Sequence, residues 1–299
     1  PQVFDRLRSQ AALQQNKRKT NKNSFELLDY EAGRGVSRMP KPDAGDLFFD
    51  MEGDPLYPEG LEYLFGVSFL KGGELTFLPF WAHNHEEERA TFSQFMEFLK
   101  QHLTAHPDAY IYHYNHYETT ALKRLACRYA TAEHQLDDLL RRMKFVDLYK
   151  VVRESVRVSE PSYSIKNLEV FYMAERGGNV TTAGDSIVVY NNWRETGESI
   201  LLQEIATYNE VDCVSTAKLR DWLLSHRSAN GAWFDGPTST TDADAAADKT
   251  AARLEREARY ADFQTKLLSS ATSGDCRGPL ADLLEFHARE GRPQWWEYR

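Results

Sequence analysis

Hydrophobic and polar positions divide the chain into strand-like and helix-like stretches. The apolar run 46–52 ends at a Gly-Asp-Pro turn and predicts a buried strand, while runs 64–70 and 74–80 flank a Lys-Gly-Gly turn and predict a hairpin. The β-rich run 109–114 leads into a stretch with apolar residues at helical spacing. Helical periodicity recurs in three further stretches, 4–15, 86–102 and 199–224. Early strands followed by strand–helix units predict an α/β fold.

Two acidic residues close the first predicted strand. Asp50 and Glu52 are two positions apart, so a strand places both side chains on one face. Like charges that close repel each other unless a cation lies between them, and carboxylate oxygens suit Mg²⁺ or Mn²⁺. Acidic residues also occur at strand ends as simple turn formers. The pair therefore indicates a metal site only when other residues support it.

Further candidate residues stand near the predicted helices. Glu118 lies where run 109–114 passes into a helix, a position that either the helix dipole or a metal explains. Tyr208 and Asp212 are four apart in the predicted helix 199–224 and share one face. The alternative for this pair is a tyrosine packed in the core beside a solvated aspartate.

The order of these motifs resembles the DEDD exonuclease superfamily of the ribonuclease-H-like fold, in its tyrosine-containing DEDDy variant. The three motifs correspond here to Asp50-x-Glu52, Asn115-x-x-Glu118 and Tyr208-x-x-x-Asp212. The phrases at 45–55 and 112–118 are most similar to the ribonuclease-H-like domain of RecB-family nucleases. The resemblance covers 45–224 and implies a mixed five-stranded sheet flanked by helices, with helical N- and C-terminal extensions.

The resemblance also implies an activity, namely two-metal-ion hydrolysis of phosphodiester bonds with Mg²⁺ or Mn²⁺. Asp50, Glu52 and Asp212 would hold one ion, and Asp50 and Glu118 the other. Tyr208 would orient the attacking water, because a phenol with a pKa of about 10 is a poor base at neutral pH.

Three polar residues are expected to bind substrate. Lys166 and Ser164 precede a helix that lines the cleft in such nucleases, and Asn115 belongs to the second motif. Lys166 would meet a phosphate, although a lone lysine near a helix start is also typical of a solvated side chain. Asn115 is equally compatible with a turn.

The second motif departs from the superfamily, which usually has aspartate where this chain has Glu118. Asp147, which ends a short apolar run, is the alternative ligand. Its position ahead of a helical pattern favours an N-cap role, so Glu118 is the preferred ligand.

Composition limits the partners. The formal net charge is −9, so the chain as a whole does not attract nucleic acid. Basic runs stand at 17–19 and 141–144. Each is more typical of a solvated face than of a binding patch, and the second is the better candidate for a contact. Three cysteines without C-x-x-C spacing argue against a disulfide framework or a zinc site. No apolar stretch reaches membrane-spanning length and no signal peptide is visible, so we expect a cytoplasmic protein without a membrane partner.

The expected organisation has four parts, an N-terminal extension (1–45), a nuclease domain (46–228), a flexible linker (229–250) and a helical connector (251–299). The connector resembles the segment that joins such domains to a superfamily 1 helicase, which implies a helicase domain in the full-length protein and a role in DNA repair. The expected function is 3′–5′ exonuclease action on single-stranded DNA. Two alternatives remain, a non-catalytic nucleic-acid-binding or scaffolding domain of a helicase-nuclease, and a ribonuclease acting on RNA.

Overall fold

The computed structural model describes residues 2–174, 182–228, 231–236, 243–269, 276–284, 286 and 296. The chain forms two units, Pro1–Gly236 and Pro237–Arg299. The first unit contains every residue considered above as a site candidate.

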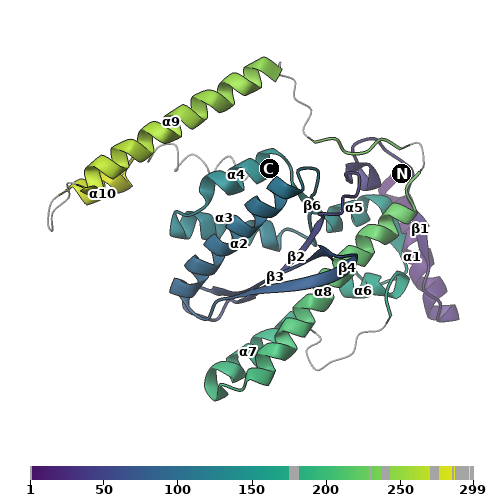
Figure 1. Ribbon diagram of the computed structural model, residues 1–299. Helices are drawn as coiled ribbons and strands as arrows, with labels where there is room; N and C mark the ends of the chain where they lie inside the picture. The colour runs from purple at the N-terminus through teal and green to yellow at the C-terminus, as the bar shows by residue number, and fades with distance from the viewer. Residues whose placement is uncertain are drawn as a thin grey trace. The chain divides into compact units, whose positions relative to one another are not determined.

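A five-stranded mixed sheet forms the centre of the first unit, with strand order β4-β3-β2-β5-β6 (Figure 1). Its strands are β2 (Leu47–Asp54), β3 (Leu61–Lys71), β4 (Glu74–Trp81), β5 (Ile111–His113) and β6 (Phe145–Asp147). β2, β3 and β4 are antiparallel neighbours, whereas β5 and β6 run parallel to β2. The predicted mixed five-stranded sheet is confirmed.

The predicted hairpin joins β3 to β4. Gly72 and Gly73 form its turn with φ of 64° and 90°, a backbone region that glycine adopts without steric cost. The strands then pair in register from Lys71 and Glu74 to Leu64 and Trp81.

Side chains of β2 alternate between two layers of helices. Phe49 stacks on Phe95 of α2 (His85–Ala105), with ring centroids 4.7 Å apart. α3 (Tyr117–Tyr129) and α4 (Glu133–Arg141) contact α2 in this layer. Phe48, the neighbour of Phe49, packs instead into a cluster with α8 (Ser199–Ser225). Even-numbered positions of β2 therefore face α8.

α8 lies against the sheet along one stripe of buried residues. Ile205, Tyr208, Asp212, Leu219 and Leu223 are buried at intervals of three, four or seven positions, which is the spacing of one helix face. Contacts with β2, β3, β4 and β5 place this face across the sheet. The helix predicted over 199–224 is confirmed.

The N-terminal segment packs into the core of the first unit. β1 (Phe25–Leu27) pairs antiparallel with β7 (Val156–Val158) in a separate two-stranded sheet. Phe25 packs edge-on against Trp222 of α8, at 5.1 Å between ring centroids. Met39 is fully buried in the same cluster. The segment predicted as an extension is thus continuous with the core around α8.

The other elements of the first unit are helices of different lengths. Their bounds are α1 (Gln2–Thr20), η1 (Gly35–Arg38), α5 (Leu148–Ser155), α6 (Ile165–Leu168), η2 (Glu169–Phe171) and α7 (Ala183–Thr196). α7 contacts both α8 and β2.

The second unit contains α9 (Ala243–Ser269) and α10 (Arg277–Asp282), which contact each other. α9 begins within the stretch predicted as a linker, and its first turns hold several alanines, the residue with the highest helix propensity. Residues 229–230 and 237–242 of that stretch lie outside the described residues. No helix in the described ranges has the length and apolar character needed to cross a membrane.

A buried ion pair joins α8 to the start of β2. Nη1 of Arg220 donates to Oδ2 of Asp46 at 2.6 Å, and the guanidinium lies over the ring of Phe48. Asp46 also accepts backbone N–H groups of Asp43 and Tyr110, each at 3.0 Å. Burial raises the pKa of Asp46 to about 6, although these partners lower it. The carboxylate is therefore charged at neutral pH and depends on Arg220 for compensation.

Replacing Arg220 with alanine should lower the free energy of unfolding at neutral pH by about 3–5 kcal/mol, because the Asp46 charge would stay buried without its partner. Urea denaturation measures this change. Arg141→Ala is the matched control, since Arg141 forms an exposed pair with Asp137 one helical turn away and its loss should cost less than about 1 kcal/mol. Equal losses in the two variants would contradict the assigned role of the Arg220–Asp46 pair.

Candidate metal centre

Asp50 and Glu52 lie on the α8 side of β2, next to its carboxyl end. They follow Phe48 at intervals of two, so the alternation of the strand directs all three toward α8. Glu52 is buried and Asp50 is half-buried. The prediction that the two carboxylates share one face is confirmed.

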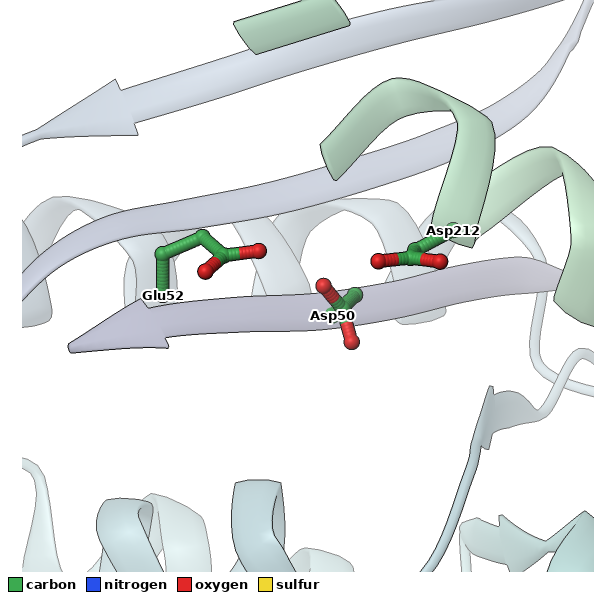
Figure 2. A group of neighbouring side chains, drawn as sticks. All are labelled: Asp50, Glu52 and Asp212. Atoms are coloured by element: carbon green, nitrogen blue, oxygen red, sulfur yellow. The ribbon is translucent and has the colours of Figure 1, made fainter. Parts of the chain in front are cut away.

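Asp212 of α8 completes a group of three carboxylates. One oxygen from each of Asp50, Glu52 and Asp212 can be chosen so that all lie within 4.8 Å of one another (Figure 2). The side chains come from one strand and one helix and point into the same space. Three carboxylate oxygens at this spacing are a donor set for a hard divalent cation such as Mg²⁺ or Mn²⁺.

The electrostatics of the group favour a cation. Burial, followed by the nearby Asp212 carboxylate, raises the pKa of Glu52 above its ordinary value. Hydrogen bonds from Ser186 and Asn209 and the charge of Lys166 act in the opposite direction but do not cancel this effect. A divalent ion between the three groups would offset the repulsion, so the residues present fit such an ion.

Tyr208 lies one turn before Asp212 on the buried face of α8. Nζ of Lys166 donates to the hydroxyl of Tyr208 at 2.7 Å and lies 4.6 Å from the centre of its ring. Lys166 belongs to α6, 42 positions earlier in the chain. The structure therefore brings two predicted site residues, Tyr208 and Lys166, into direct contact.

Glu118 lies beside a buried histidine. The group of three carboxylates does not include it, and its Oε2 lies 3.4 Å from Nδ1 of His113 at the end of β5. Both side chains are buried. Burial lowers the pKa of His113, but Glu118, the charge of Asp147 and the backbone of Asn115 together outweigh burial and raise the pKa above its ordinary value. The role predicted for Glu118, to hold a second ion with Asp50, remains a prediction.

Asn115, Ser164 and Asp147 have local backbone roles. Asn115 has a φ of 77°, and its N–H donates to Oδ1 of Asp147 at 2.9 Å. The same Asp147 oxygen accepts the N–H of Tyr149 at the start of α5, so the favoured N-cap role is confirmed. Ser164 caps α6 by accepting the N–H of Asn167. Substrate contacts of Ser164 and Asn115 remain predictions.

The basic residues at 141–144 have partners within the protein, and their expected contact with nucleic acid remains a prediction. Arg141 and Arg142 pair with Asp137 and Asp138 one turn earlier on α4. Lys144 is buried and donates to the carbonyl groups of Pro107 and Ala109. Pairing one turn apart on a helix was readable from the spacing.

Two residues that contact the carboxylates were not predicted. Nδ2 of Asn209 donates to Oδ2 of Asp50 at 2.6 Å. Ser186 of α7 hydrogen-bonds Glu52 and shares a hydrogen bond of 2.6 Å with the hydroxyl of Tyr63. Asn209 lies three positions before Asp212, on the same helix face, and this spacing was the available signal. No sequence signal singles out Ser186.

A mixed sheet whose central strand β2 supplies two carboxylates, with a third carboxylate from α8 packed across it, defines a ribonuclease-H-like domain. Residues 47–224 match the family described as the RNase_H superfamily, which is more than half of the 299 residues. The chain belongs to this superfamily. Searches of curated proteins and of solved structures found no match to this chain. Membership supports a metal-dependent nuclease in general and, with it, nucleic acid as the partner.

Mn²⁺ should stabilise the protein more strongly as pH rises. Glu52 has a folded-state pKa above its ordinary value of 4.5, so the ion-free protein loses stability as pH rises from that value and the carboxyl loses its proton. A bound cation removes this loss and also competes with the proton. Thermal unfolding with and without Mn²⁺ over a pH series measures the increment. An increment that is constant with pH in the wild type, or that persists in Asp212→Asn, would contradict this assignment.

The first bound ion should depend on Glu52 and not on Glu118. Glu52→Gln removes a carboxylate of the group and should weaken Mn²⁺ binding by at least about tenfold, the lower range for loss of outer-shell partners of metal ligands. Glu118→Gln should leave the dissociation constant of that ion unchanged. Isothermal titration of the full chain with Mn²⁺ distinguishes the two variants. Equal losses would place Glu118 among the ligands of the first ion.

Proposed function

We propose that this chain is a DEDDy-type nuclease that removes nucleotides from the 3′ end of single-stranded DNA. The observation that carries the proposal is the grouping of Asp50, Glu52 and Asp212 in a domain of the RNase_H superfamily. Tyr208 and Lys166 beside the group support the tyrosine-containing type of site. DNA as substrate, the 3′–5′ direction and exonuclease action rest on the resemblance of the motifs.

A divalent ion held by the three carboxylates supplies a Lewis acid for a phosphate oxygen and favours deprotonation of the attacking water. The protein contributes the geometry of the ligands. Glu52 and Asp50 are fixed on a central strand, and Asp212 is fixed on a helix buried across that strand. Ligands on rigid elements hold a productive geometry better than ligands on loops.

Tyr208 is suited to orient the attacking water. Its oxygen accepts the hydrogen bond of Lys166. The hydroxyl can then direct its own proton to an acceptor or accept a second hydrogen bond from water. We assign Tyr208 the role of holding this water in line with the phosphorus atom, because positioning of the attacking group lowers the barrier of such displacements.

Lys166 supplies the positive charge for the substrate phosphate. The chain is acidic overall, and the basic run at 141–144 is engaged elsewhere. The charge of Lys166 acts on Glu52, so its ammonium group is near the carboxylates that hold the ion. Lys166 would therefore stabilise the additional negative charge of a substrate phosphate in the transition state.

The second ion of the expected mechanism would use Asp50 and Glu118. Glu118 contacts His113 through Oε2, so its other carboxylate oxygen would be the candidate donor to an ion shared with Asp50. We therefore propose that Asp50, Glu52 and Asp212 would hold the first ion, and that Asp50 and Glu118 would hold the second.

A cleavage assay with end-labelled DNA and RNA strands, with Mg²⁺, Mn²⁺ or chelator, tests the function. We expect shortening of single-stranded DNA from the 3′ end, dependent on the ion. Asp50→Asn should lower the rate by about a thousandfold, since loss of several kcal/mol of charge stabilisation corresponds to this factor.

Asp54→Asn is the matched control, because Asp54 lies on the same strand, outside the group, and accepts the N–H of Leu56. It should keep the wild-type rate. Cleavage of RNA alone would change the substrate class. Binding of strands without cleavage by the wild type would instead support a non-catalytic scaffolding domain, the role proposed as the alternative. A helicase partner in the full-length protein remains part of the proposal.

A further inference from the structure

Asn209 is a fully buried amide inside the carboxylate group. It lies on α8 between Tyr208 and Asp212, and its Nδ2 donates to Oδ2 of Asp50 at 2.6 Å. It also hydrogen-bonds Glu52. A single neutral side chain therefore contacts both carboxylates contributed by β2.

The amide has an orientation that only the carboxylates explain. Oδ1 of Asn209 is buried and has no hydrogen-bond partner among the described residues. A buried polar atom left without a partner costs about 1–3 kcal/mol. Turning the amide over would direct Oδ1 at the Asp50 carboxylate, where two acceptors would repel each other. Nδ2 of Asn209 is therefore held toward Asp50, although Oδ1 of the same amide is then left without a hydrogen bond.

Gly66 provides the space for this amide. It is the cross-strand partner of Asp50 in the pairing of β2 with β3. A Cβ at Gly66 would lie 1.6 Å from Oδ1 and 2.8 Å from Cγ of Asn209, distances that no side chain tolerates. Cys213 of α8 also contacts this glycine, through Sγ and the Gly66 carbonyl oxygen at 3.4 Å. Gly66 is thus a point where the helix backbone approaches the strand closely.

We propose that Asn209, seated over Gly66, is the positioning residue that fixes Asp50 and Glu52 in the arrangement that binds the divalent ion. The inference rests on the proposed metal site. A neutral donor is suited to this role because it orients two like-charged ligands without adding a charge that competes with the ion. Partners of this kind fix the orientation of metal ligands and tune their affinity.

The test is Mn²⁺ binding by isothermal titration of the full chain. Asn209→Ala should weaken binding by ~10–100-fold, the range typical of lost outer-shell partners. Asn209→Leu keeps the number and branching of the side-chain heavy atoms and removes the donor, so it should show the same loss in affinity while its melting temperature stays closer to that of the wild type. Wild-type affinity in Asn209→Leu would mean that the amide only fills space, and would overturn the proposal.

Gly66→Ala provides an independent test through the same amide. In the wild-type background the new methyl group must displace Asn209 from Asp50, so Mn²⁺ affinity should fall as in Asn209→Ala. In the Asn209→Ala background the amide is already gone, and the second substitution should cause little further loss. Half-buried Phe77, whose ring edge also meets the methyl group, can shift. Equal losses in both backgrounds would show that Gly66 acts without Asn209 and would overturn the proposal.

Ser215→Ala is the control for general damage to α8. Ser215 is fully buried on the same helix and donates to Oε1 of Glu169 at 2.6 Å. Its loss should lower the melting temperature and leave Mn²⁺ affinity unchanged. A wild-type chain that binds no Mn²⁺ would refute the proposed metal site itself. Wild-type binding that is unaffected by the Asn209 variants would refute only the positioning role.

Discussion

Repulsion among three carboxylates is opposed by apolar packing of one helix on the sheet. Two unit charges about 4 Å apart repel by about 4 kcal/mol at an effective dielectric constant of about 20. Ile205, Leu219 and Leu223 of α8 are fully buried, and burial of each such side chain contributes about 1.5–3 kcal/mol. Packing on either side of Asp212 is thus large enough to hold it against β2. The fold creates an unfavourable concentration of negative charge that a divalent cation relieves.

The distribution of charge favours recognition of a phosphodiester at the carboxylate site rather than along a basic surface. The chain is acidic, and the basic residues at 141–144 form ion pairs or donate to carbonyl groups of the protein itself. Lys166 differs because its ammonium contacts the phenol of Tyr208 at the site itself. Long-range attraction of a polyanion is weak under these conditions. Affinity for a phosphodiester would come from contacts at the site and from the ion bound there.

The sequence predicted features that depend on periodicity. Alternation along β2 placed Asp50 and Glu52 on one face, and helical spacing placed Tyr208 with Asp212. The hairpin at Gly72 and Gly73 followed from turn chemistry in the same way. These features are local, so a few neighbouring residues determine them.

Contacts between segments that are distant in the sequence were harder to predict. Asn209 donates to a residue 159 positions away, and it resembles any buried helical asparagine when only the sequence is known. β1 and β7 have three residues each, which is too short for a recognisable alternation. In each case the missing information was tertiary.

The pairing of β1 with β7 determines where a truncated form of this domain can begin. Phe25 packs on Phe171 and Trp222, and Phe234 donates its N–H to the Met39 carbonyl, so the first forty residues seal the side of the core that carries α8. A fragment trimmed to the segment that bears the sequence motifs would expose this apolar surface and loosen the helix that presents Asp212. A fragment of the domain intended for transfer to another protein should therefore start well before Asp50, the first residue of the first acidic motif.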